Sequence, residues 1–134
     1  MPTILCIDDQ PVGLAIRKAL LETQGYKVVI AENGPGGIAL AREHQIDAVV
    51  LDYRMRGMYG NAVAAILKSE YPQLPIVLLS GVPDLPPAVL ALVDAYIAKG
   101  DGARALLSTL EQLTPPRRKR FLPAAESARE QRTA

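Results

Sequence analysis

Short apolar runs, separated by longer stretches with helical periodicity, constrain the fold of this chain more than any other feature. Four of the runs read ILCI, AVVL, IVLL and AYIA, and the residues that follow them are Asp8, Asp52, Ser80 and Lys99. Runs of this length and composition predict parallel strands that are buried on both faces. Strands that alternate with helices predict right-handed βαβ units, and therefore a three-layer α/β/α sandwich.

Periodicity, prolines and glycines set the expected elements. We predict strands at residues 3–7, 27–31, 47–51, 76–79 and 95–97. We predict helices at residues 11–23, after a turn at 33–37, at 61–71, at 87–93 and at 101–113. Asn61 is the expected cap of the third helix. Prolines between residues 81 and 87 delay the fourth helix, because proline is tolerated only in a first turn.

The chain has 134 residues and is expected to form one domain over residues 1–114, followed by a basic tail at 115–134. Residues 1–114 hold nine basic and twelve acidic side chains, whereas the tail holds six basic and two acidic ones. The tail has few apolar residues, which predicts disorder. Its run at 117–120 is basic, but it brings no groove-reading element, so we expect no sequence-specific DNA binding.

Targeting signals are lacking in the sequence. Its apolar runs fall short of the roughly 20 residues that span a bilayer. The N-terminus enters a strand at once and has no basic region of a signal peptide. The single cysteine, Cys6, lies inside a predicted strand, where a cysteine usually acts as a small hydrophobe. By default, these features lead us to expect a cytoplasmic protein without a membrane span.

The polar residues at the strand ends predict one shared site. In a doubly wound parallel sheet the carboxyl ends of the strands lie at one edge, and ligands bind there. The acidic pair Asp8 and Asp9 would join Asp52, and the three carboxylates would repel one another. A divalent cation such as Mg²⁺ removes that repulsion. Asp9, Asp52 and the backbone carbonyl of Arg54 could be its direct ligands, and Asp8 could hold a coordinated water.

The same edge suits phosphoryl chemistry. Asp52 stands alone at a strand end beside an open loop, which makes it the better candidate for a nucleophile that forms an aspartyl phosphate. Lys99 can bring a compact positive charge to the phosphoryl oxygens, and Ser80 can donate a hydroxyl hydrogen bond. The backbone N–H of Gly81 can approach the phosphate closely because no side chain is in the way.

These residues, over positions 3–113, resemble the receiver domain of two-component response regulators. The resemblance implies a flavodoxin-like sheet with strand order 2-1-3-4-5 and Mg²⁺-dependent phosphotransfer to Asp52 from a sensor histidine kinase or a histidine phosphotransfer protein. It also implies that phosphorylation draws Ser80 inward, that the aromatic Tyr96 follows, and that a downstream protein senses this face. For Tyr96 alone, ordinary packing in an edge strand remains equally open.

The chain departs from the family pattern at three places. Gly100 follows Lys99 where proline is usual, Arg56 stands where proline is common, and the segment between Ser80 and Lys99 is short. The short segment makes the usual fourth helix doubtful. Receiver dimers often form through that helix, so a homodimer is possible but not fixed by the sequence. Arg54, beside the path of hydrolytic water, is a candidate for tuning the lifetime of the phosphoryl group.

Several functions compete on the sequence. The leading one is a phosphorylation-dependent switch, not an enzyme beyond its self-catalysed phosphotransfer and autodephosphorylation, and with no output domain of its own. A phosphoryl relay or sink, or a degenerate receiver that only binds partners, are the alternatives within this family. A phosphatase or phosphotransferase of similar fold would need a second acid/base residue and a substrate cap, and no insertion is large enough for a cap. Each site residue taken alone has an ordinary structural reading, but the joint pattern favours the switch.

Overall fold

The computed structural model describes residues 1–114, so the predicted tail at 115–134 lies outside the described residues. Its strands are β1 (Thr3–Ile7), β2 (Lys27–Ala31), β3 (Ala48–Asp52), β4 (Ile76–Ser80) and β5 (Ala95–Ala98). Its helices are α1 (Pro11–Thr23), α2 (Gly34–Glu43), α3 (Gly60–Glu70), α4 (Pro87–Leu90), the 3₁₀ turn η1 (Lys99–Asp101) and α5 (Gly102–Leu113). The five strands are parallel and lie in the order β2-β1-β3-β4-β5, which confirms the predicted flavodoxin-like sheet.

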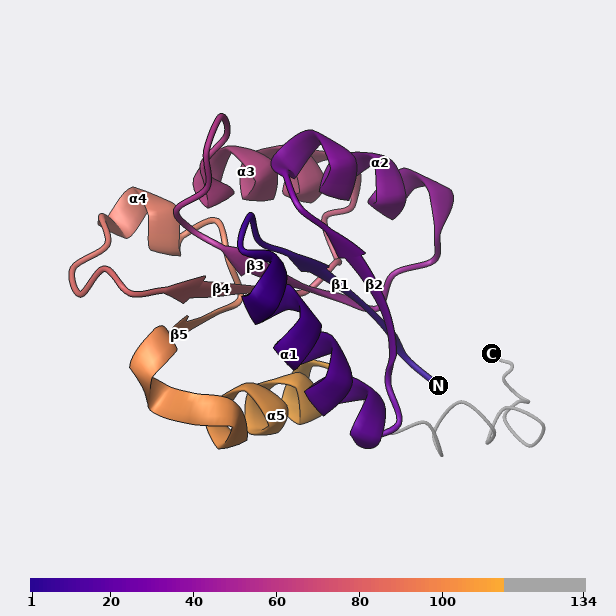
Figure 1. Ribbon diagram of the computed structural model, residues 1–134. Helices are drawn as coiled ribbons and strands as arrows, with labels where there is room; N and C mark the ends of the chain where they lie inside the picture. Colours follow the sequence, from indigo (N-terminus) through magenta and orange to yellow (C-terminus); the bar gives the residue numbers. More distant parts are fainter. Residues whose placement is uncertain (115–134) are drawn as a thin grey trace.

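Helices cover both faces of the sheet and make the three predicted layers. Helices α2 and α3 lie on one face, and α1 and α5 lie on the other (Figure 1). Because successive side chains of a strand point to opposite faces, each strand contributes to both layers of core. In β1, Ile4 and Cys6 pack toward α1 and α5, whereas Leu5 and Ile7 pack toward α2 and α3. This alternation decides which helix can reach each residue at a strand end.

Cys6 belongs to the core, as its position in a strand predicts. Its side chain is fully buried on the α1 and α5 side of the sheet. Burial raises the pKa of the Cys6 thiol to about 12, since the interior disfavours the thiolate. The thiol is therefore protonated at neutral pH and acts as a small apolar group.

Two helices begin earlier than predicted. Helix α2 starts at Gly34, inside the predicted turn, because the Asn33 side chain accepts a hydrogen bond at 2.7 Å from the backbone N–H of Gly36 and caps it. Helix α3 starts at Gly60, so the predicted cap Asn61 lies inside the helix. Glycine suits both first positions, because neighbouring atoms lie where a Cβ would be. A Cβ at Gly34 would lie 2.7 Å from the sulfur of Met58, and one at Gly60 would lie 2.5 Å from the carbonyl oxygen of Asp52.

The fourth helix is a single turn, shorter than the predicted 87–93. It covers Pro87–Leu90, and the backbone then turns through hydrogen bonds from Leu92 and Val93. At Asp94 the chain already donates to the carbonyl of Ile76 at the start of the neighbouring strand. The prolines before the helix and this early return to the sheet leave no room for a longer α4.

Candidate functional site

The strand register places the predicted site residues at one edge of the sheet. Ile7 pairs with Leu51, so the residues that follow them, Asp8 and Asp52, are neighbours. Ser80 pairs with Ala98, so Lys99 comes directly after the last residue of the adjacent strand. The order of strands therefore brings the ends of β1, β3, β4 and β5 together, as the sequence predicted.

A cavity of about 340 Å³ opens at this edge. Its lining residues are Asp9, Gln10, Asp52, Arg54, Ser80, Gly81, Val82 and Lys99. The predicted Asp8 and Tyr96 are not among them, although both lie close behind: Asp8 is part of the acidic cluster, and Tyr96 bonds to a lining residue. The lining thus gathers carboxylates, an ammonium, a hydroxyl and a glycine backbone around one small space.

The three carboxylates form a compact cluster. One oxygen from each of Asp8, Asp9 and Asp52 lies within 4.8 Å of the others. Asp8 and Asp52 are buried, and Asp9 is partly exposed. Carboxylate oxygens are hard donors of the kind that Mg²⁺ prefers, and the cluster leaves an open side toward the cavity for water and a phosphate oxygen. The donor set therefore fits a divalent cation.

Asp52 is paired with the predicted lysine. The Lys99 ammonium lies 2.8 Å from Oδ1 of Asp52, whose side chain is only 3% exposed. Burial raises the pKa of the Asp52 carboxyl, and the Lys99 hydrogen bond opposes that rise without cancelling it. The neighbouring charge of Asp8 adds to the rise. The anionic form of Asp52 is therefore energetically unfavourable in the folded protein, and an additional positive charge beside it would stabilise that form.

Asp9 is held by the loop between β3 and α3. Its Oδ2 accepts a hydrogen bond at 2.9 Å from the backbone N–H of Arg56, and the Arg56 guanidinium lies 3.3 Å away. The backbone N–H of Arg56 is the main reason that the pKa of Asp9 lies below its ordinary value. Asp9 is therefore anionic at neutral pH and oriented at the rim of the cavity. Arg56 stands where proline is common in the receiver pattern, and it supplies a backbone N–H that proline lacks.

Asp8 has a partner that the sequence analysis missed. The guanidinium of Arg17, in α1, forms an ion pair with Oδ2 of Asp8. Oδ1 of Asp8 accepts the backbone N–H of Gln10 at 3.0 Å. The signal was available: residues at alternate positions in β1 face the same side, so Asp8 faces α1, and Arg17 lies within that helix.

A chain of hydrogen bonds connects Ser80 to Tyr96. The Ser80 hydroxyl accepts the backbone N–H of Val82 at 2.9 Å, and the Tyr96 hydroxyl donates to the Val82 carbonyl at 3.1 Å. Ser80 is buried and Tyr96 is half-buried. Both side chains share the sheet face of Leu78, because Ser80 lies two residues beyond it. The backbone of Val82 therefore links the two residues.

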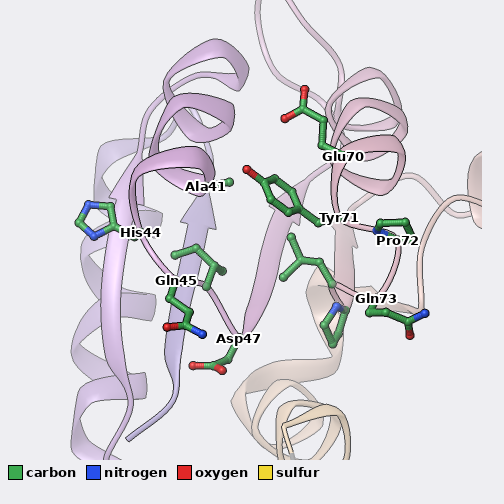
Figure 2. Close-up of a pocket in the computed structure, with 11 residues that line it drawn as sticks. Ala41, His44, Gln45, Asp47, Glu70, Tyr71, Pro72 and Gln73 are labelled. Atoms are coloured by element: carbon green, nitrogen blue, oxygen red, sulfur yellow. The ribbon is translucent and has the colours of Figure 1, made fainter.

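A larger cavity, of about 520 Å³, lies at the opposite edge of the sheet, between the ends of α2 and α3. Figure 2 shows its walls, with Ala41, His44 and Asp47 on one side and Glu70 and Tyr71 on the other. Its lining is mostly apolar and loop-derived, and it gathers no cluster of like charges. Chemistry rather than size therefore selects the smaller cavity as the candidate site.

Among residues 1–114, no helix combines the length and the apolar character that a bilayer crossing needs.

Comparison with known proteins assigns the family. The model of the response regulator receiver domain matches residues 4–111. The transcriptional regulatory protein KdpE from Mycobacterium tuberculosis is 34% identical over 113 residues, which cover 82% of this chain and 50% of KdpE. Several curated relatives are longer still, so the chain spans half or less of their length.

Solved structures agree with this assignment. The response regulator TrrA from Thermotoga maritima, in complex with Mg²⁺-BeF, has a TM-score of 0.78 at 28% identity, covering 84% of this chain and 99% of TrrA. TrrA in complex with the histidine kinase ThkA gives a TM-score of 0.80 at 27% identity, covering 86% of this chain and all of the matched one (100%). With the strand order, the clustered carboxylates and the family match in agreement, the chain belongs to the receiver domains of two-component response regulators.

Proposed function

We propose that this chain is a phosphoryl-accepting receiver that takes a phosphoryl group from a histidine kinase, or from a histidine phosphotransfer protein, onto Asp52. The observation that carries the proposal is the Asp52 carboxylate, which lies on the floor of the cavity between Lys99 and the acidic pair. A complex of the similar TrrA with a kinase supports the choice of donor. The chemistry is self-catalysed phosphotransfer from that donor, followed by autodephosphorylation.

The proposed transfer follows from the positions of the groups. An oxygen of Asp52 attacks phosphorus, a P–O bond forms, and the P–N bond of the phosphohistidine breaks with its electron pair returning to the imidazole. Mg²⁺, held by Asp9, Asp52 and the backbone carbonyl of Arg54, would neutralise charge on the phosphoryl oxygens. Lys99 then leaves the carboxylate for a phosphoryl oxygen, and Ser80 and the N–H of Gly81 donate to the others.

The proposed switch uses the link through Val82. The Ser80 hydroxyl accepts a hydrogen bond from the Val82 N–H. This bond breaks when the hydroxyl turns toward the phosphoryl group. The loop after β4 must then rearrange, and the Tyr96 hydroxyl loses or moves its acceptor, the Val82 carbonyl. Because α4 is a single turn, the face around β5 and this loop is the surface that a downstream protein, or a second copy of the chain, would sense.

An exposed apolar stretch on α1 supports docking of the donor. Val12 is 72% exposed and Ile16 is 64% exposed, although both are large and apolar. Ile16 lines a groove between α1 and α5 that also reaches Lys99 and Asp8, and this groove adjoins the candidate site. Exposed apolar patches beside polar residues are typical of protein-binding surfaces. A kinase helix seated there would have its phosphohistidine near Asp52.

Mass spectrometry after incubation with Mg²⁺ and acetyl phosphate tests the proposal. We expect a gain of one phosphoryl group in wild-type protein and none when EDTA is added before the donor. Protein that gains no phosphoryl group and also fails to bind beryllofluoride with Mg²⁺ would contradict the proposal and favour a receiver that only binds partners. Beryllofluoride binding without an observable adduct would instead show an aspartyl phosphate of short lifetime.

Arg54 is expected to lengthen the life of the phosphoryl group. Its exposed side chain lines the cavity beside Asp52, and we infer that it shields the acceptor from hydrolytic water. Removal of the side chain in Arg54→Ala should admit water and raise the dephosphorylation rate by roughly threefold to tenfold. Phosphate release from pre-phosphorylated protein measures the rate. Arg104→Ala removes the same charge from α5 at a distance and should leave the rate unchanged; equal rates in all three proteins would reject the role of Arg54.

A further inference from the structure

The ion pair between Arg17 and Asp8 differs from an ordinary surface pair. The Arg17 side chain is 16% exposed and the Asp8 side chain is 2% exposed, so both charges are largely removed from water. The other carboxylate oxygen of Asp8, Oδ1, accepts a hydrogen bond from the backbone N–H of Gln10. A buried carboxylate that is bonded through both oxygens is held in one position.

Gly13 leaves room for this guanidinium. A Cβ at position 13 would lie 3.5 Å from Nη2 of Arg17, 3.6 Å from Oδ2 of Asp8 and 3.7 Å from Nη1 of Arg17. Residues 13 and 17 are four apart in α1 and therefore face the same side of the helix. Any side chain longer than alanine at position 13 would compete with the guanidinium for the space beside Asp8.

Each carboxylate of the cluster has a cation from this chain, but the three cations are not equivalent. The side chain of Arg56, beside Asp9, is 86% exposed, and that of Lys99, beside Asp52, is 40% exposed. Solvent and salt screen such charges, and their side chains can move aside. The Arg17 side chain is only 16% exposed and is paired with Asp8, so water screens its charge less than it screens the charges of Arg56 and Lys99.

We propose that Arg17 is a resident counter-cation of the acidic cluster, which stabilises the metal-free protein and weakens Mg²⁺ binding. The inference rests on the proposed function, in which Mg²⁺ binds at this cluster. The physical reason has two parts. Without Arg17, Asp8 would be a buried charge next to two other carboxylates, which is costly. With Arg17, an entering divalent cation meets a fixed like charge, and the repulsion is only partly screened at this burial.

The proposal has a consequence for the site. Asp9 and Asp52 line the cavity and Asp8, held by Arg17 and the Gln10 N–H, does not, which agrees with Asp9 and Asp52 as the direct ligands. Phosphorylation of this receiver should then respond to the Mg²⁺ concentration over a higher range than it would without Arg17.

Arg17→Gln tests the proposal, since glutamine keeps a hydrogen-bond donor for Asp8 but carries no charge. Arg56→Gln is the matched control, with the same charge removed at an exposed position. Mg²⁺ alone is the probe, at constant ionic strength and without a phosphoryl donor. We expect calorimetric titration to show Mg²⁺ binding about tenfold tighter in Arg17→Gln and changed less than about threefold in Arg56→Gln.

Thermal unfolding separates this role from simple packing. In EDTA, the Tm of Arg17→Gln should lie below that of the wild-type protein, and the gap should shrink as Mg²⁺ replaces the missing charge. A gap that is the same with and without Mg²⁺, together with unchanged affinity, would overturn the proposal, whereas Mg²⁺ binding by wild-type protein would still support the proposed function. No Mg²⁺ binding by either protein would overturn both.

Gly13→Leu provides the second variant if Arg17→Gln does not fold. It retains the charge of Arg17 but places a branched side chain where the guanidinium lies. We expect a gain in Mg²⁺ affinity of the same direction, because the displaced Arg17 moves toward solvent. An affinity equal to that of wild-type protein would overturn the proposal.

Discussion

Asp52→Asn should abolish phosphoryl uptake and at the same time stabilise the metal-free protein. The amide is nearly isosteric with the carboxylate but is not a nucleophile toward phosphorus at neutral pH. Intact mass after treatment with Mg²⁺ and acetyl phosphate should therefore show no adduct. An adduct of wild-type yield in the variant would place the acceptor on another residue and contradict the proposed role of Asp52.

The gain in stability follows from the charge that the substitution removes. Burial and Asp8 raise the pKa of Asp52, so its anionic form costs stability in the folded state. The amide removes this cost, and the Lys99 ammonium loses its partner at little expense because it is 40% exposed. We expect Asp52→Asn to raise the free energy of unfolding by on the order of 1 kcal/mol in EDTA at pH 7.

The pH dependence gives the prediction a second readout. For a carboxyl whose pKa is raised by folding, the native state holds more protons than the unfolded state between the two pKa values. Stability of the wild-type protein from this group therefore rises as the pH falls through the raised value. The advantage of Asp52→Asn should be largest at pH 7 and should shrink toward the ordinary carboxyl pKa of about 4. An advantage that grows as the pH falls would contradict the burial argument.

Gly60→Ala should destabilise the fold more than any other alanine substitution of a glycine near the site. A Cβ at position 60 would lie 2.5 Å from the carbonyl oxygen of Asp52 and 3.0 Å from the Cα of Tyr53. Both neighbours are backbone, so neither can rotate away. The Gly60 N–H also donates to the Tyr53 carbonyl at 2.7 Å, which fixes the start of α3 against the end of β3.

Two opposing effects set the change in the free energy of unfolding of Gly60→Ala. Overpacking of this kind costs about 1–3 kcal/mol, and more where backbone must move. The better helix propensity of alanine returns at most about 1 kcal/mol. We expect a net loss of about 2 kcal/mol in urea unfolding. Gly81→Ala is the control, because a Cβ at position 81 meets nothing within 4 Å, and its stability should stay within about 0.5 kcal/mol of wild type. Equal midpoints for the two variants would show that the contact at Gly60 is relieved cheaply.

Gly60→Ala should also weaken phosphoryl uptake, because the shifted backbone belongs to Asp52 itself. Displacement of the nucleophile by even a fraction of an ångström disturbs the line between the attacking oxygen and phosphorus. The rate of uptake from acetyl phosphate, measured under conditions where the variant is fully folded, would report this effect separately from stability.

The sequence determined the fold and the composition of the candidate site. Continuous apolar runs predict buried strands, because both faces of such a strand are removed from water. Once five such strands are parallel, their carboxyl ends share an edge, so the convergence of Asp52, Ser80 and Lys99 followed from local patterns alone. The ends of elements were less accurate: the fourth helix was predicted too long, and α2 was predicted to start too late.

Only the tertiary structure decided the contacts that pair one residue with another across elements. The sequence analysis did not single out Arg17, because its position against Asp8 depends on how α1 packs on the sheet and on the space beside Gly13. The link from Ser80 to Tyr96 runs through the backbone of Val82, which no side-chain pattern reports. The reason is physical: local sequence sets hydrophobic periodicity and strand ends, whereas ion pairs and close approaches arise from interatomic distances that exist only after the layers have packed.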